Sequence, residues 1–318
     1  MKKLNRPNVV VIGGGTGLPV ILEGLKGQEI NLTAIVAVAD DGGSSGKIRK
    51  QMDVLPPGDI RNVMVALSNV DPRFVELLQY RFNVDGELSG HVIGNLILIA
   101  LSELNESYVA AIDILSKVLR IRGKVIPATD KPLILKAKMK DGSIVTGESM
   151  IPLQGKQIDH VFLEPKDVKP LDSALQAIKE ADLITIGPGS LYTSILPNLL
   201  VKDLAQAIVE SKAPKVYITN ILTQIGETDD FSDADHIQVI HEHVGVPFID
   251  KTLINISDVP KELLFPDDVM QVKHDVDGMA KLGIQAVYED FLSTEDRLVR
   301  HDGEKVARAL LNLLPEKE

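Results

Sequence analysis

The chain has 318 residues, 44% of them apolar and 25% charged, a composition typical of a globular protein with a sizeable core. The net charge of −11 and the aromatic content of only 4% argue against nucleic-acid binding, which needs basic surfaces or stacking platforms. The chain has no cysteine, which excludes disulfides, thiolate catalysis and cysteine-ligated metals.

Apolar runs in this chain are short. A membrane-spanning helix needs about 20 consecutive apolar residues, and no such run occurs. The apolar run at 9–12, which follows the first lysines, is also too short for the core of a signal peptide. We therefore expect a cytoplasmic protein without a membrane span.

Short apolar runs alternate with helical patterns along most of the chain, which predicts βαβ units and a mostly parallel sheet. Buried strands are expected at 8–12 and 32–39, with a helix at 18–26 between them. The stretch 40–58 is rich in Gly, Ser, Pro and Asp and predicts a long loop with one helical turn. Further helices are expected at 59–68, 73–81, 92–103 and 109–119.

The middle of the chain follows a different pattern. Two strand-like runs, 132–139 and 143–149, flank Lys-Asp-Gly, and Asp-Gly between strands indicates a hairpin. We interpret about 123–165 as a small antiparallel insertion or sheet edge. The βα pattern then resumes, with helices expected at 171–179, 201–211 and 304–314 and strands at 183–186, 215–219, 246–256 and 284–288.

The first strand runs directly into a glycine-rich loop. It consists of Gly13, Gly14, Gly15, Thr16 and Gly17. Glycines let the backbone approach a phosphate without a Cβ clash, and the helix that follows directs its free N–H groups at the anion. The dinucleotide fingerprint requires a glycine at position 18, where this chain has leucine. It also requires an acidic residue about 20 positions on, and none is clear here. We therefore predict phosphate binding rather than an NAD site; a turn with only a packing role is the alternative.

Asp40 and Asp41 follow the second strand. Ligands of open α/β sheets bind outside the carboxyl ends of strands, so this position suits a site. Two carboxylates there could hold a sugar hydroxyl, a ring nitrogen or, through water, Mg²⁺. The alternative is a solvated turn in which the aspartates cap the next turn. Both residues are candidates for catalysis, and Mg²⁺ is a candidate cofactor.

The segment Pro-Gly-Asp-Ile-Arg-Asn at 57–62 combines a helix start with an unusual charge. Asp59 suits an N-cap. Arg61 and Asn62 would lie in the first helical turn, where the helix dipole disfavours arginine unless it meets an anion. This conflict with a local rule predicts a contact with substrate, sugar or base.

Three histidines attract attention for their positions. His91 and Asn95 are four residues apart and would share one helix face, where they could contact a ligand. His91 is also a candidate for catalysis, and a purely structural histidine is the alternative. His241 and His243 cannot share a face of a helix, so we interpret them as surface residues.

An apolar strand, a glycine turn and a hydroxyl-rich helix start recur at 184–195. The residues concerned are Gly187, Gly189, Ser190, Thr193 and Ser194. They provide a second set of anion-binding donors, and two such loops in one chain are more specific than either alone. Asn220, at the end of the next strand, is a candidate for sugar or base contact or else part of a polar loop. No P-loop, nucleophile elbow or His-Glu-x-x-His motif occurs, so hydrolase and kinase functions lack support.

These segments, in this order, resemble the CofD-like family, and more closely its gluconeogenesis-factor branch (YvcK-like proteins). The resemblance extends from Val9 to the terminal helix. It rests on the strings Gly-Gly-Gly-Thr-Gly-Leu, Asp-Asp-Gly-Gly-Ser-Ser-Gly, Pro-Gly-Asp-Ile-Arg-Asn, Gly-Asn-Leu and Gly-Pro-Gly-Ser-Leu-Tyr-Thr-Ser-Ile. It implies a single α/β domain over residues 1–318, with a three-layer α/β/α Rossmann-like fold.

The two branches of the family imply different functions. The CofD transferases move a phospholactyl group from a nucleotide-linked donor to a deazaflavin precursor, with Mg²⁺. In them the segment equivalent to 57–62 helps hold the deazaflavin and is more acidic than it is here. The gluconeogenesis-factor branch implies binding of UDP-sugars such as UDP-N-acetylglucosamine. It also implies a role in cell shape and peptidoglycan synthesis during gluconeogenic growth, with no established reaction.

Our leading hypothesis is a UDP-sugar-binding regulatory protein. The two glycine loops would hold the diphosphate, while the segments 40–41 and 59–62 would face sugar, base or metal. A Mg²⁺-dependent phosphoryl-type transferase is the alternative, and an NAD-dependent dehydrogenase is disfavoured by Leu18. The partners expected are a nucleotide sugar, cell-wall synthesis proteins and further copies of the chain in a homo-oligomer.

Overall fold

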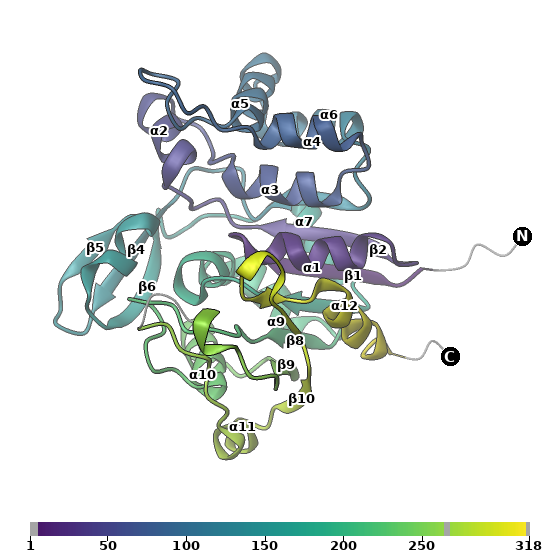
Figure 1. The fold of residues 1–318 in the computed structure, drawn as a ribbon, viewed down its shortest axis with the longest axis vertical. Coiled ribbons are helices and arrows are strands. Elements are labelled where there is room, and N and C mark those ends of the chain that lie inside the picture. Colours follow the sequence, from purple (N-terminus) through teal and green to yellow (C-terminus); the bar gives the residue numbers. More distant parts are fainter. Residues whose placement is uncertain (1–5, 264–267, 316–318) are drawn as a thin grey trace, which may run out of the picture.

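The computed structural model describes residues 6–263 and 268–315. Its centre is a sheet in the order β10-β9-β8-β7-β1-β2-β3, and every neighbouring pair is parallel (Figure 1). Its strands are β1 (Asn8–Gly13), β2 (Asn31–Val36), β3 (Lys124–Pro127), β7 (Leu183–Ile186), β8 (Lys215–Ile218), β9 (Lys251–Asn255) and β10 (Gln285–Glu289).

The order of the strands creates a switch point beside β1. The chain first extends the sheet from β1 through β2 to β3, then returns to the other side of β1 with β7 and continues outwards to β10. Val11 of β1 lies between Ala34 of β2 and Thr185 of β7. Connections that leave in opposite directions open a crevice at the carboxyl ends of β1 and β7.

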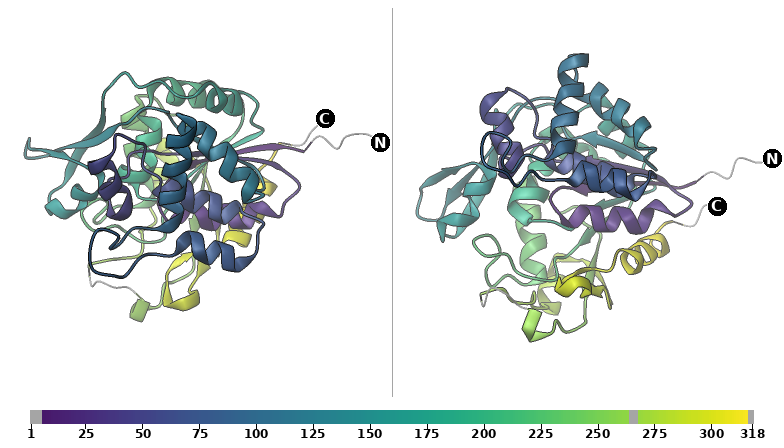
Figure 2. Two further views of the ribbon diagram at one scale, coloured as in Figure 1. Left: turned by 90° about the horizontal axis from the view of Figure 1, so that it is seen from above. Right: turned by 45° about the horizontal axis from the view of Figure 1, so that its top comes forward.

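Helices cover both faces of the sheet, as the two views of Figure 2 show. On one face lie α1 (Gly17–Lys26), α3 (Gly58–Leu67) and α12 (Gly303–Asn312), with α4 (Pro72–Gln79), α5 (Ile93–Asn105) and α6 (Tyr108–Val118) extending this layer. The other layer contains α7 (Asp172–Lys179), α8 (Leu196–Leu199), α9 (Lys202–Glu210), α10 (Asp233–Val244) and α11 (Val276–Leu282). The α/β Rossmann-like fold with a mostly parallel sheet is therefore confirmed.

A small antiparallel sheet stands at the carboxyl side of the main sheet (Figure 1). It consists of β4 (Ile134–Met139), β5 (Ile144–Thr146) and β6 (Ile158–Glu164), and short 3₁₀ turns at Glu148–Met150 and Pro152–Gln154 follow β5. The expected insertion at 123–165 is thus present, although its first strand, β3, pairs with β2 as an edge of the main sheet. A second hairpin, β11 (Leu292–Ser293) with β12 (Arg300–His301), precedes α12.

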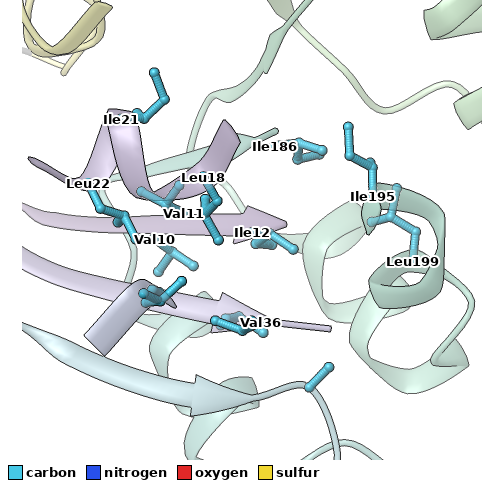
Figure 3. Close-up of a cluster of buried hydrophobic side chains, with 14 of the residues drawn as sticks. Val10, Val11, Ile12, Leu18, Ile21, Leu22, Val36, Ile186, Ile195 and Leu199 are labelled. Carbon is cyan, nitrogen blue, oxygen red and sulfur yellow. The ribbon is translucent and has the colours of Figure 1, made fainter. Parts of the chain in front are cut away.

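The core continues directly into the switch point (Figure 3). Val11, Ile12 and Leu18 are fully buried, and so are Ile186 and Ile195 from the second glycine segment. Burying an aliphatic side chain of this size stabilises the fold by about 1.5–3 kcal/mol. Both glycine loops therefore grow out of the best-buried part of the molecule, which holds their backbones in place.

The terminal helix docks as expected, through Val306 and Leu310, both fully buried, while Leu314 is partly buried. The close approach of α12 to α1 requires Gly24 and Gly303. A Cβ built on Gly24 of α1 would lie 2.0 Å from the carbonyl oxygen of Gly303, so the two helices touch backbone to backbone.

Two sequence predictions about helices are wrong. The expected long loop at 40–58 contains a nine-residue helix, α2 (Gly43–Gln51), held by buried Ile48 and by Arg49, which donates to the carbonyl oxygens of Ala39 and Leu133. His241 and His243, expected at the surface, lie in α10, where His241 is buried and accepts from the N–H of Ile249.

Candidate functional site

The two glycine loops meet at the switch point. A Cβ on Gly17 would lie 3.2 Å from the carbonyl oxygen of Pro188, and a Cβ on Gly189 would lie 3.1 Å from that of Gly14. Asn198 of α8 donates to the carbonyl oxygen of Gly13 over 3.1 Å and so ties the layers together. The structure thus brings together the two loops that the sequence singled out.

Gly15 shows why this loop needs glycine. Its φ is +68°, a left-handed conformation that costs other residues energy, and a Cβ there would lie 2.9 Å from Ser194 Oγ. Thr16 is the N-cap of α1 but its side chain makes no capping hydrogen bond, so the first N–H groups of the helix remain available. These are the donors of an anion site.

The second loop is held by side chains from the segment after β8. Asn220 accepts from the N–H of Gly189 over 3.3 Å and donates to its carbonyl oxygen over 2.8 Å. Gln224 donates to Ser190 Oγ over 2.7 Å. The Asn220 carboxamide, a candidate for sugar or base contact, is therefore occupied with positioning the loop.

Thr193 and Ser194 lie in one turn of π-helix, Leu191–Ile195, ahead of α8. Thr193 Oγ1 donates to Glu227 over 2.9 Å, and the N–H of Tyr192 donates to the other carboxylate oxygen over 3.1 Å. Glu227 is buried, and this burial raises its pKa to about 7. Ser194 faces Gly15, whereas Thr193 is directed to the glutamate.

Asp59 connects α3 to the first loop. The expectation that it is an N-cap is wrong, because Pro57 occupies that position. Instead Asp59 Oδ2 accepts from the N–H of Gly15 over 2.7 Å. Burial raises the pKa of Asp59 to about 6; Asp40 also raises it, while the hydrogen bond from Gly15 and the charge of Arg61 lower it. This carboxyl therefore changes its protonation near neutral pH.

The side chains of Asp40 and Asp41 contact different parts of the structure. Asp40 Oδ1 accepts from the N–H of Gly42 over 2.8 Å, and its other oxygen lies 2.6 Å from where a Cβ of Gly58 would be, next to the start of α3. Asp41 instead accepts from the N–H of Ser149 in the insertion over 2.8 Å. Asp41 thus anchors the insertion, and only Asp40 faces Asp59.

Glu148 joins this acidic group from the insertion. Burial raises its pKa well above the ordinary value, and the nearby charges of Asp59 and Asp40 raise it further. Sequence reasoning missed both Glu148 and Glu227, because their partners lie far along the chain and neither glutamate belongs to a glycine motif.

His91 and Asn95 do not share a helix face, since α5 begins at Ile93 after its N-cap Val92, and His91 lies before it. His91 Nδ1 lies 3.5 Å from Ser44 Oγ of α2. Both His91 and Asn95 are buried. Together with Arg61 and Asn62 they lie around α2 and α5, a place distinct from the glycine loops.

A cleft of about 470 Å³ opens beside the two glycine loops. Its walls come from Gly15, Thr16, Gly17, Pro188, Gly189, Ser190, Asn220, Thr223, Gln224, Arg300, His301 and apolar neighbours. Arg300 is the one cation among its described lining residues, and sequence reasoning missed it. Burial lowers the pKa of His301 to about 4, so it is neutral at pH 7 and donates to the carbonyl oxygen of Thr219.

A larger cavity, about 920 Å³, lies at the opposite end of the sheet, against the amino ends of β1, β2 and β3. Its larger volume alone would favour this cavity as the ligand site. We favour the smaller cleft, because helix N-termini and glycine turns converge there and ligands of open α/β sheets bind at carboxyl ends.

Residues 6–263 and 268–315 contain neither a cluster of metal-ligating side chains nor a membrane-spanning helix. No three His, Asp or Glu side chains are grouped to hold a metal ion. None of the helices combines the length and the apolar character needed to cross a bilayer.

Comparison with known proteins places this geometry in a family. A family model described as 2-phospho-L-lactate transferase CofD matches residues 9–292. The gluconeogenesis factor of Listeria monocytogenes is 75% identical over 317 residues, covering 100% of this chain and 98% of that protein. The gluconeogenesis factor of Bacillus subtilis is 45% identical, covering 98% and 99%.

A crystal structure of a Bacillus halodurans protein matches the fold with a TM-score of 0.95 at 48% identity, covering 96% of this chain and 100% of that one. The gluconeogenesis factor of Halalkalibacterium halodurans is 49% identical over 315 residues, covering 98% of this chain and 98% of that protein. On the family model and on relatives aligned over almost their whole length, this chain belongs to the CofD family.

Proposed function

We propose that this chain binds a nucleotide sugar of the UDP-N-acetylglucosamine type and acts as a regulatory protein. The observation that carries the proposal is the contact between two glycine loops at the switch point, beside a cleft of about 470 Å³ with a single arginine. A diphosphate is the group that such a pair of backbone loops suits best.

In this proposal each part of the site has one task. The free N–H groups after Thr16 and the Ser190 loop hold the diphosphate, and Arg300 neutralises part of its charge. Asp59 and Asp40, on the α3 side of the first loop, accept hydrogen bonds from sugar hydroxyls.

A regulatory role is supported by the names of the relatives and by the side chains. The relatives are called gluconeogenesis factors. We propose in addition that this chain acts in the control of cell shape and peptidoglycan synthesis during gluconeogenic growth. The described residues that line the cleft include no lysine, and its histidine, His301, is used in a backbone hydrogen bond. Cell-wall synthesis proteins in the cytoplasm would read the ligand state.

A transferase acting on a nucleotide-linked donor is the second candidate, favoured by the pair Asp40 and Asp59. Mg²⁺ commonly binds through one or two carboxylates plus substrate phosphates, and this pair beside a phosphate loop fits that donor set. Bound there, the metal would neutralise charge on the diphosphate. Asp59 would then orient the first loop through Gly15, and Asp40 would hold the turn at Gly42.

Titration calorimetry against UDP-N-acetylglucosamine, UDP-glucose, GDP and NAD tests the proposal. We expect the UDP-sugars to bind and Arg300→Ala to weaken them about tenfold, the loss of one charge-assisted contact. Arg308→Ala, an exposed cation on α12, is the matched control and should change nothing. Absence of UDP-sugar binding at millimolar concentration would overturn the proposal; consumption of the sugar nucleotide with Mg²⁺ and cell extract would support the transferase instead.

A further inference from the structure

We propose that the N-terminus of α2, together with Arg61 and Arg81, forms a second anion site that takes a carboxylate or phosphate group. This inference rests on the proposed function only for the identity of the ligand, since the site itself is separate from the glycine loops. The sequence already pointed to an anion here, because arginine in a first helical turn is disfavoured unless it meets one. Phosphate binding at the glycine loops does not involve Arg61.

The start of α2 provides uncapped donors. Its N-cap is Gly42, which has no side chain to accept from the first turn. Among the described residues, the N–H groups of Gly43, Ser44 and Ser45 have no acceptor. Ser44 and Ser45 are buried, so water reaches these groups poorly. Such a helix end attracts negative charge through its dipole and its free donors.

Arg61 is a buried cation with Asp59 and Asp40 nearby but with no direct ion pair among the described residues. Its side chain is 8% exposed and packs over Gly94, where a Cβ would lie 2.7 Å from Arg61 Cδ. Nη2 donates to the neutral amide oxygen of Asn62, while Nε has no partner. No described carboxylate lies within ion-pair distance of this arginine. Buried arginines are normally paired, so this one lacks the partner that an anion would supply.

Arg81 brings a second cation to the same place. Its Nη1 donates to the carbonyl oxygen of Gly90 and lies 3.9 Å from where a Cβ of Gly43 would be. Arg81 forms a backbone bridge with Val92, two residues before the Gly94 on which Arg61 packs, so both arginines contact the segment 92–94 beside the start of α2. Burial and the charge of Arg81 lower the pKa of Arg61, while Asp59 and Asp40 raise it. In a chain with a net charge of −11, two unpaired arginines at a helix N-terminus need a reason.

The surrounding polar groups complete the site. Ser44 Oγ accepts from the N–H of Val92 over 3.3 Å and faces His91, which fixes α5 beside α2. Arginine forks and backbone N–H groups are the donors that bind planar carboxylates and phosphates.

The ligand has two sources with the same chemistry. Asp59 contacts Gly15 of the first loop, and the charges of Asp59 and Arg61 shift each other's pKa, so a sugar bound at Asp59 lies near that arginine. A carboxylate carried by that sugar would reach the new site. A free oxyanion, such as inorganic phosphate, would fill it independently.

Thermal-shift and calorimetric titrations with three probes test the proposal: inorganic phosphate, UDP-N-acetylglucosamine and UDP-glucuronate, whose sugar carries a carboxylate. The variants are Arg81→Gln, an exposed residue whose guanidinium donates to the carbonyl oxygen of Gly90, and Arg73→Gln at the other end of α4 as the matched control. Gly15→Ala, in the first loop, separates phosphate bound there from phosphate bound at α2.

We expect UDP-glucuronate to bind about tenfold more tightly than UDP-N-acetylglucosamine, the contribution of one charge-assisted pair. Arg81→Gln should remove that preference, while Arg73→Gln should keep it. If phosphate alone raises the melting temperature, with loss in Arg81→Gln but not in Gly15→Ala, the source is a free oxyanion. This second result would support the site even if no UDP-sugar bound, in which case only the proposed function fails. Anion effects that persist unchanged in Arg81→Gln, or no anion effect at all, would overturn the site.

Discussion

The two ends of the parallel sheet differ: the larger cavity lies at the amino end, whereas the glycine turns lie beside the smaller cleft at the carboxyl end. At the carboxyl end the cleft of about 470 Å³ is bordered by backbone turns and by side chains that hold those turns, such as Asn220 and Gln224. At the amino end the cavity of about 920 Å³ is lined by charged side chains of both signs, such as Arg122 and Glu180. Its one glycine, Gly123, lets the chain pass the carbonyl oxygen of Leu32.

This difference is our reason for proposing the ligand site where fixed donors converge and not where the empty volume is largest. At the carboxyl end, strands lead into turns, and the N-termini of the following helices face the cleft. Those donors are fixed by the buried core around Ile12 and Ile186. Long charged side chains at the amino end are individually mobile and hydrated, so they bind weakly unless several converge on one group.

The largest expected effect comes from Gly15→Ala. A Cβ there combines the left-handed φ of +68° with a contact of 2.9 Å to Ser194 Oγ, so the loop must move. We expect UDP-sugar affinity to fall about 100-fold, near 2.7 kcal/mol. Gly27→Ala, at the end of α1, meets nothing within 4 Å and is the control. Calorimetry on both variants measures the difference, and equal affinities would remove the first loop from the site.

Glu227→Gln tests how the second loop is supported. The pKa of this buried glutamate is raised from 4.5 to about 7, so the folded state binds its proton more tightly than the unfolded state. Stability must then fall as pH rises from about 4.5 to about 7, by on the order of 3 kcal/mol, and remain level above that.

Glutamine keeps an acceptor for the N–H of Tyr192, and its amide N–H can donate to Thr193 Oγ1 in place of the bond that Thr193 now donates. Urea unfolding at about pH 5 and about pH 8 should therefore show a larger loss in the native protein than in the variant, which keeps only the loss due to other groups such as Asp59. Identical pH profiles would mean that Glu227 is not held as the structure shows.

Asn220→Ala removes both hydrogen bonds to Gly189 and leaves its N–H without that partner. We expect UDP-sugar affinity to fall about tenfold and the free energy of unfolding to fall by about 1 kcal/mol. Calorimetry and urea unfolding measure these two quantities. An unchanged affinity would show that the second loop needs no support from β8.

The smallest effect is expected at the amino end. Arg122→Ala removes a cation from the larger cavity without touching either glycine loop. Binding of every nucleotide in the panel should stay within twofold of the native value. A clear loss of affinity would mean that the larger cavity takes part in binding, which would reverse the comparison.

Sequence patterns predicted the main sheet because its signals are local. The apolar runs at 8–12 and 183–186 form β1 and β7, and the glycine turns that follow them lie where strand ends meet. The helix α2 was missed, because its sequence Gly-Ser-Ser-Gly-Lys-Ile-Arg-Lys-Gln has a single buried aliphatic residue, Ile48, and its stability comes from packing and from Arg49.

The partners within the site could not be predicted, because they join residues far apart in the chain. Asp59 meets Gly15 across 44 positions, and Thr193 meets Glu227 across 34. Asp41 looked equivalent to Asp40, yet it reaches the insertion 108 positions away at Ser149. Only the folded arrangement shows which of two neighbouring residues faces the candidate site and which holds the scaffold.

A crystal structure of this protein soaked with UDP-N-acetylglucosamine would show which end of the sheet holds the ligand. We predict diphosphate density between Gly15 and Gly189, with Arg300 against it and the sugar towards Asp59. Density for the ligand in the amino-end cavity beside Arg122, with the glycine loops empty, would contradict this prediction.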